Sequence, residues 1–117
     1  MLLQILKSKL QKVIITGAST EYEGSLTLDP DLMDAASLYP YERVEVNAVN
    51  HGTRIVTYII PGERGTGQVE MNGGAANYFS PKDEIHVNCF ALVDHIIVHL
   101  YEFPAIVKTD ENNKVIG

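Results

Sequence analysis

The pair Gly24-Ser25 joins a serine hydroxyl to an acyl group that carries no side chain. A serine hydroxyl can attack the carbonyl carbon of the preceding residue and replace the amide bond by an ester. When the fold enforces the geometry, such an intramolecular attack gains an effective concentration of roughly 10⁵ M or more. Glycine leaves the carbonyl uncrowded and tolerates backbone strain. Taken alone, however, a Gly-Ser pair after two polar residues forms a turn in nearly every protein.

Arg54 and Lys9 are the cations whose placement matters most, because the chain is acidic. The net charge at pH 7 is −6, and the arginines are those at positions 43, 54 and 64. A nucleic-acid binder normally presents a basic face with aromatic platforms, so we expect no nucleic-acid partner. An acidic chain can still bind an acidic small molecule where its few cations converge. Without further support, Arg54 is a surface strand residue and Lys9 a solvated edge lysine.

Other potentially reactive residues fit structural explanations better. His95 and His99 would share a strand face roughly 13 Å apart, which is too far for two bonds of about 2 Å to one zinc ion. The GERGTG segment lacks the Walker lysine and a following helix, so it is interpreted as a turn. Cys89 lies in an apolar run and is expected in the core. No histidine has a convincing partner for a Ser-His-Asp arrangement.

Five short fragments at characteristic separations carry a family resemblance. They are Lys9 in SKL, Tyr22-Glu23-Gly24-Ser25, Arg54 with Thr57-Tyr58 in RIVTY, the ERG turn at 63–65, and Asn72-Gly73 followed by Gly74-Ala75-Ala76. Each is weak singly, but together they make the chain resemble the aspartate 1-decarboxylases over nearly its whole length. The resemblance implies a double-psi β-barrel, a homotetramer with active sites between subunits, and a role in pantothenate (coenzyme A) biosynthesis.

The resemblance also implies that the chain cuts itself between Gly24 and Ser25, into residues 1–24 (the β chain) and 25–117 (the α chain). Elimination of the ester leaves dehydroalanine at position 25, which hydrolyses to a pyruvoyl ketone. This ketone is a covalent cofactor, and neither pyridoxal phosphate nor a metal is expected. L-Aspartate forms a Schiff base with it, loses its α-carboxylate as CO2 and leaves as β-alanine.

Roles for individual residues follow from the same resemblance. Ser25 supplies the catalytic pyruvoyl group, and Tyr58 is the proton donor. Arg54 is expected to hold a substrate carboxylate, preferably the β-carboxylate, because a planar guanidinium can bind one through two hydrogen bonds. Thr57 would polarise the Gly24 carbonyl during cleavage. The full set of substrate-binding residues is Lys9, Arg54, Thr57, Asn72, Gly73, Gly74 and Ala75, with Tyr22 in a supporting position.

Two positions depart from the family pattern. Gln11 stands where a histidine close to the cleavage site is usual, and glutamine cannot accept a proton near neutral pH, so we expect slow self-cleavage. Gly74 replaces an alanine and should loosen its loop. Two alternatives stay open: a slowly or conditionally processed zymogen of the same family, and a non-catalytic small barrel that acts as a binding module.

The elements that must position these residues are mainly short strands within one domain, 1–117. β-Branched and aliphatic runs predict strands at 2–7, 10–16, 43–49, 54–60, 67–71, 84–92, 96–101 and 105–108. Asp29-Pro30 predicts the start of a helix through DLMDAASL, and a second short helix is expected after Asn72. The DENNK tail is a polar turn or a frayed end. So many short strands favour a closed, mainly β barrel.

Composition also bears on location. The single cysteine, Cys89, cannot form an internal disulfide, which fits a reducing compartment. No stretch approaches the roughly 18 apolar residues of a membrane span. The apolar part of the first segment is too short for a signal peptide and is interrupted by Gln4. We therefore expect a first strand there and a cytoplasmic protein.

Overall fold

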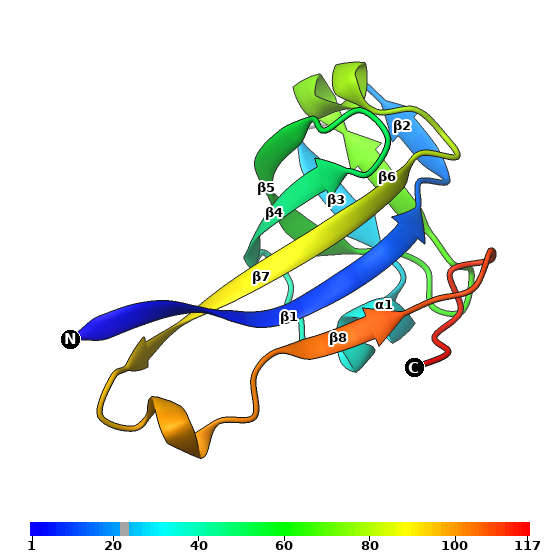
Figure 1. Ribbon diagram of the computed structural model, residues 1–117. Coiled ribbons are helices and arrows are strands. Elements are labelled where there is room, and N and C mark those ends of the chain that lie inside the picture. Colours follow the sequence, from blue (N-terminus) through cyan, green and yellow to red (C-terminus); the bar gives the residue numbers. More distant parts are fainter. Residues whose placement is uncertain (22–23) are drawn as a thin grey trace.

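The computed structural model describes residues 1–21 and 24–117, and β-strands dominate it (Figure 1). Its elements are, in order, β1 (Leu2–Ile14), β2 (Gly17–Ser19), β3 (Ser25–Leu28), α1 (Pro30–Ala35), β4 (Arg43–Ala48), β5 (Arg54–Pro61), β6 (Val69–Asn72), the 3-10 helix η1 (Gly73–Tyr78), β7 (Glu84–Asp94), the 3-10 helix η2 (Val98–Leu100) and β8 (Ala105–Lys108). Among these described residues, no helix is long and apolar enough to cross a membrane.

The strands form one curved sheet in the order β2-β6-β3-β5-β4-β7-β1-β8. The pairs β2/β6, β3/β5 and β1/β8 are parallel, and the other pairs are antiparallel. In β4, buried Val44, Val46 and Ala48 alternate with the more exposed residues between them, which is the period of a strand with one face on a core. Each long strand therefore presents an inner, apolar face and an outer face that is available for chemistry.

The inner faces meet in a single hydrophobic core to which strands at both ends of the chain and α1 contribute. Its fully buried members include Leu10, Val13, Leu26, Leu28, Leu32, Val46, Ile59, Val69, Met71 and Ile85. Cys89 also lies there, as predicted. Burial raises the pKa of the Cys89 thiol to about 11, with the nearby Glu42 carboxylate acting in the same direction, so it is a packed side chain and not a nucleophile.

Most of the predicted strands are confirmed, and the differences have local causes. Segments 2–7 and 10–16 join into the single strand β1, because the interruption is absorbed by shifts in register against β7. The predicted strand 96–101 is wrong: Asp94 ends β7 by accepting a hydrogen bond from the Ile96 backbone N–H at 3.0 Å, and a turn and η2 follow. The strands β2 and β3 are too short to show a period and were not predicted.

The predicted helix and the tail are both held by buried polar side chains. Asp29 caps α1 by accepting from the Asp31 N–H at 2.8 Å, and it also accepts from the N–H groups of Gly65 and Gly67 at 3.0 and 2.8 Å. The tail is a turn and is not frayed, because buried Asn113 donates to the carbonyl oxygens of Ile14 and Gly67 at 2.8 and 2.9 Å.

Candidate active site

Ser25 is the first residue of β3, and Gly24 directly precedes it. The Ser25 side chain is buried, with 1% of the residue exposed. Asn72, its partner in β6, donates from Nδ2 to Ser25 Oγ at 3.3 Å and to Thr27 Oγ1 at 2.9 Å. In the uncleaved chain, the Asn72 amide therefore holds the Ser25 hydroxyl, and its second bond, to Thr27, orients the amide.

Gly24 has open surroundings. It is exposed, and a Cβ added there would meet only the Asn72 backbone oxygen, at 3.9 Å. That is an ordinary van der Waals distance, so space alone does not demand glycine at this position. The openness agrees with the expectation that the acyl group beside Ser25 is uncrowded.

Tyr58 lies beside Ser25 across the parallel pair β3/β5. Leu26 is registered with Ile59, and extending this register by one residue places Ser25 next to Tyr58. Because Leu26 and Ile59 are fully buried, both Ser25 and Tyr58 face away from the core. Adjacent strands are about 4.8 Å apart, so the phenol group can reach the reacting position.

Thr57 lies on the other face of the same strand. It is registered with buried Val44 in β4, whereas Tyr58 is registered with exposed Arg43. The strand alternates regularly here, so Thr57 and Tyr58 point to opposite faces. The fold thus brings Tyr58, and not Thr57, to the face that carries Ser25, and a role for Thr57 at the Gly24 carbonyl stays a prediction.

The small residues after Asn72 begin η1, one position beyond the contact with Ser25. Gly73 has a φ of +75°, a left-handed conformation that favours glycine. Gly74 is exposed and an added Cβ would meet nothing, while Ala75 packs partly against the core. The predicted Tyr22 lies outside the described residues. We call Gly24, Ser25, Tyr58, Asn72 and Gly73 the serine half-site.

The two predicted substrate cations share a different part of the outer surface. Arg54 is registered with Asn47 of β4, and Asn47 is registered with His86 of β7. Lys9 of β1 is registered with Asn88, two residues further along β7. We call Lys9, Arg54, Asn47 and His86 the cation half-site. Lys9 and Arg54 are three strand spacings apart, about 14 Å between backbones, and their long side chains can converge above β7 and β4.

Within one chain, the two half-sites are well separated. Arg54 and Tyr58 lie on the same face of β5 but four residues apart, which is about 13 Å along a strand. Lys9 is four strand positions from Ser25 in the sheet. Gln11 lies in β1, on the same strand as Lys9. Its effect on the rate of cleavage stays a prediction.

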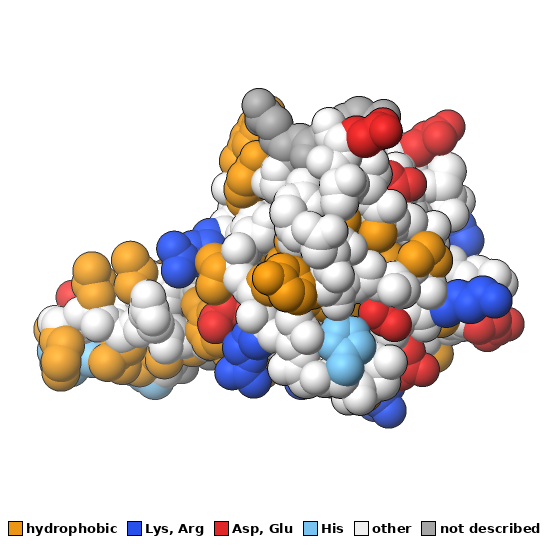
Figure 2. All heavy atoms as spheres, turned by 90° about the horizontal axis from the view of Figure 1, so that it is seen from above, with side chains coloured by type: hydrophobic (Ala, Val, Ile, Leu, Met, Phe, Trp, Pro, Cys, Tyr) orange, Lys and Arg blue, Asp and Glu red, His pale blue; other side chains and the backbone are white. Residues whose placement is uncertain are grey.

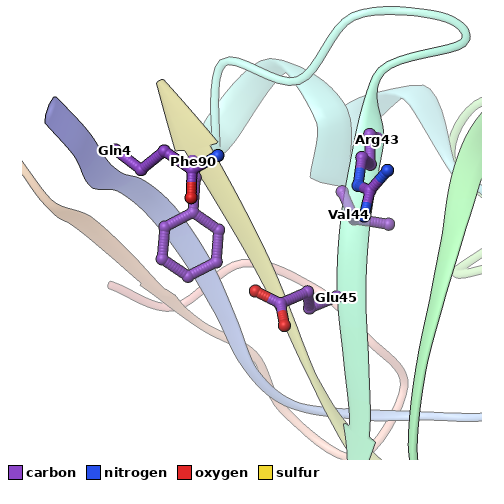
Figure 3. Close-up of a pocket in the computed structure, with 5 residues that line it drawn as sticks. All are labelled: Gln4, Arg43, Val44, Glu45 and Phe90. Carbon is purple, nitrogen blue, oxygen red and sulfur yellow. The ribbon is translucent and has the colours of Figure 1, made fainter. Parts of the chain in front are cut away.

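A cavity of about 440 Å³ lies on the outer face of β1, β7 and β4 (Figure 3). It is lined by Gln4, Arg43, Val44, Glu45 and Phe90. None of these residues was predicted to bind substrate. Arg43 connects the cavity to the serine half-site, because it is the register partner of Tyr58.

Sequence reasoning missed a hydrogen-bonded chain around His51. Its Nε2 lies 3.1 Å from Asp83 Oδ2, and its Nδ1 lies 2.8 Å from Thr53 Oγ1. The hydrogen bond from the backbone N–H of Ser80 holds the pKa of Asp83 below its usual range; burial opposes this, and His51 lowers the pKa further. The order carboxylate, imidazole, hydroxyl resembles a catalytic triad, but these residues fasten the β4–β5 turn just before Arg54. The described residues contain no cluster of His, Cys, Asp and Glu that could hold a metal.

The sequence is similar to a known protein family and to individual members of it. The sequence model of the aspartate decarboxylase family matches residues 1–116. An aspartate 1-decarboxylase of Bacillus cereus (strain B4264) is 40% identical over 112 residues, which cover 96% of this chain and 87% of the relative. Another, of Salinibacter ruber (strain DSM 13855 / M31), is 44% identical over 113 residues, which cover 97% and 77%.

A solved structure bears on the fold. The rationally designed protein mkDPBB_sym_86 superposes with a TM-score of 0.50 at 19% identity, over 66% of this chain and 90% of that one. At this identity the likeness concerns architecture alone. It confirms the predicted mainly β fold as a double-psi β-barrel.

Proposed function

The chain belongs to the aspartate decarboxylase family, and on that premise we propose that it decarboxylates L-aspartate to β-alanine and CO2 with a pyruvoyl group made from Ser25. The resemblance expected from sequence is confirmed by the match over residues 1–116. Neither the slowly processed zymogen nor the binding module is favoured by these relatives. The observation that carries the proposal is the placement of Ser25, Asn72 and Tyr58 together on one outer face beside the Gly24-Ser25 bond.

Cleavage begins at the hydroxyl that Asn72 holds. Ser25 Oγ attacks the Gly24 carbonyl carbon, the C–N bond breaks, and the serine nitrogen takes up the proton that the hydroxyl loses. Loss of the Ser25 α-proton then expels Gly24 as a free carboxylate and leaves dehydroalanine. Hydrolysis releases ammonia and leaves the ketone at position 25. The chain supplies every atom of this group except one water oxygen.

The residues around position 25 fit such a group. When formed, the pyruvoyl ketone supplies an electron sink for the carbanion that remains after CO2 is lost. Tyr58 lies beside position 25 and can deliver a proton to the substrate α-carbon. Gly73 has a left-handed backbone conformation and no Cβ, so the backbone of η1 can approach a substrate bound at position 25 closely. The Asn72 side-chain amide lies next to position 25.

Substrate carboxylates are held by the cation half-site, and we propose that a second chain completes each site. Arg54 binds the β-carboxylate through its planar guanidinium, and Lys9 is the second cation. The separation of Arg54 from Tyr58 within one chain supports sites between subunits, and we propose that these subunits form a homotetramer with closed symmetry. The two-stranded arm formed by the first part of β1 and the end of β7 projects from the body (Figure 1).

Exposed apolar side chains on that arm support the assembly. Leu2 and Leu92 of the arm are each more than 60% exposed, and so are Ile96 and Leu100 in the segment that follows β7. Figure 2 shows hydrophobic side chains gathered on the arm, at the left of the view. Patches of this kind mark surfaces that pack against another protein. We also propose a cytoplasmic location, because the lone cysteine fits a reducing compartment.

Purified protein incubated with L-aspartate tests the function. We expect release of β-alanine and CO2 without added pyridoxal phosphate, and loss of activity on treatment with borohydride and aspartate together. The Ser25→Ala variant should release neither product, since it cannot form the ketone. Equal activity in this variant would refute the proposed cofactor. A folded, processed parent that leaves aspartate unchanged would refute the proposed substrate.

A further inference from the structure

We propose that His86 is a substrate-binding residue of the cation half-site, where its Nε2–H donates a hydrogen bond to a carboxylate held between Lys9 and Arg54. This inference rests on the proposed function and deepens it by assigning a third, uncharged donor to the carboxylate subsite. Nothing in the sequence around position 86 suggests such a role, and three features of the structure support it.

The first feature is position. His86 follows fully buried Ile85 and precedes buried Val87 in β7, so its half-buried side chain points to the outer face. Asn47 separates it from Arg54 in one cross-strand row, at two strand spacings or about 10 Å. Lys9 is registered with Asn88 and is therefore a diagonal neighbour of His86, about 7–8 Å away. His86 thus lies between the two cations, nearer to each than they are to one another.

The second feature is the position of the imidazole proton. The backbone N–H of Lys12 donates to His86 Nδ1 at 3.2 Å. A backbone N–H can only donate, so Nδ1 is the unprotonated nitrogen and the proton is on Nε2. Across residues 1–21 and 24–117, no protein acceptor pairs with that Nε2. A donor is therefore left pointing to the face that carries Lys9 and Arg54.

The third feature is the charge state. Burial lowers the pKa of His86, and the ammonium groups of Lys9 and Lys12 lower it further, against an opposing effect of Glu84. The ring is therefore neutral near pH 7 and acts as a dipolar donor, not as a third cation. A neutral donor adds orientation without adding repulsion to the Lys9 ammonium. It suits a site that must admit a dianion and release a product with one carboxylate.

A purely structural role is the competing explanation, and it uses the other ring nitrogen. Lys12 has a φ of +60° at a register shift of β1, and the bond to Nδ1 holds this strained residue. Two substitutions separate the roles. His86→Asn places an acceptor near Nδ1 but removes the Nε2 donor. His86→Gln places an amide donor near Nε2 but loses the acceptor for Lys12.

The experiment compares these variants as processed enzymes, with cleavage verified by mass. We expect His86→Asn to raise the KM for L-aspartate and the inhibition constant of succinate by roughly tenfold or more, with kcat little changed, because a bond to a charged acceptor is lost. Succinate reports carboxylate binding without chemistry. His86→Gln should retain values within about threefold of the parent.

The opposite ranking would overturn the proposal. If His86→Asn binds like the parent while His86→Gln is impaired or melts earlier, His86 only holds the Lys12 backbone. Arg54→Ala, measured in parallel, separates this outcome from failure of the proposed function. If Arg54→Ala binds weakly while His86→Asn binds like the parent, His86 takes no part in substrate binding but Arg54 does. Parental binding in Arg54→Ala as well would remove the whole cation half-site from substrate recognition.

Discussion

Asn72 and Ser25 face each other across β6 and β3, with Asn72 Nδ2 at 3.3 Å from Ser25 Oγ. A second bond from the same nitrogen, to Thr27 Oγ1 at 2.9 Å, fixes the orientation of the amide. The hydroxyl that attacks the Gly24 carbonyl is therefore held in place before any bond breaks. Intramolecular reactions are sensitive to such positioning, since displacement by about 1 Å can cost 10²-fold in rate.

Asn72→Ala is accordingly expected to slow self-cleavage by roughly 10-fold to 100-fold. The measurement is the rate at which the 25–117 fragment appears in freshly synthesised protein. Thr27→Val is the matched control, because it removes the second acceptor but keeps the contact with Ser25, and we expect a smaller loss. Parental cleavage rates in a folded Asn72→Ala variant would show that this amide does not position the nucleophile.

Subunit complementation tests the separation of the half-sites. A chain carrying Ser25→Ala keeps its cation half-site, and a chain carrying Arg54→Ala keeps its serine half-site. Each variant alone should be nearly inactive. If every site combines the two half-sites of different chains, co-expression should restore about a quarter of the parental activity, because random assembly leaves about a quarter of sites intact.

A second pairing serves as the control for this experiment. Ser25 and Tyr58 belong to the same half-site, so co-expressed Ser25→Ala and Tyr58→Phe chains should give no more than the sum of the single variants. If co-expressed Ser25→Ala and Arg54→Ala chains give only the sum of their separate activities, one chain supplies both half-sites.

Asp29 is expected to dominate the acid sensitivity of the fold. Burial disfavours its charge, but hydrogen bonds from the backbone N–H groups of Asp31, Gly67 and Gly65 outweigh this and hold the pKa of the carboxyl below its ordinary value of 3.8. The folded state thus binds the Asp29 proton less tightly than the unfolded state does. The resulting stability is complete above about pH 4 and is lost as the pH falls through the lower, folded pKa.

Asp29→Ala should therefore lower the free energy of unfolding by roughly 2–4 kcal/mol at pH 7, since three charge-assisted bonds from backbone N–H groups, the one from Gly67 buried, are lost. The deficit relative to the parent should shrink below pH 4. Denaturant unfolding in a Ser25→Ala background, which keeps the chain intact, measures both. Asp34→Ala is the control: its carboxylate pairs with Arg64 at the surface, so it should cost under about 1 kcal/mol. A pH-independent deficit for Asp29→Ala would contradict the account.

The sequence revealed some of these features and not others, for physical reasons. The alternation of Val44, Val46 and Ala48 predicts a half-buried strand, and the Asp29-Pro30 pair predicts the start of α1; both are confirmed. The strand β3 spans only Ser25–Leu28, too few residues to show a period, although it carries the nucleophile. Its pairing with β6 and β5 could not be read from local pattern.

His86 illustrates the same limit for the site. Its relation to Arg54 runs through Asn47 and depends on the registers of two strand pairs, which connect residues far apart in the sequence. The relation to Lys9 depends on where β1 shifts its register. Family resemblance supplied Lys9 and Arg54, but a residue whose role comes from cross-strand neighbours has no signature in its own segment.

Self-cleavage is tested by the intact mass of purified protein after prolonged warming, for the parent and for Ser25→Ala. We expect the parent to yield fragments 1–24 and 25–117, with the larger fragment lighter by one ammonia than a chain beginning with serine, and Ser25→Ala to stay whole. A parent that remains full length, or a Ser25→Ala variant cut at the same bond, would contradict this expectation.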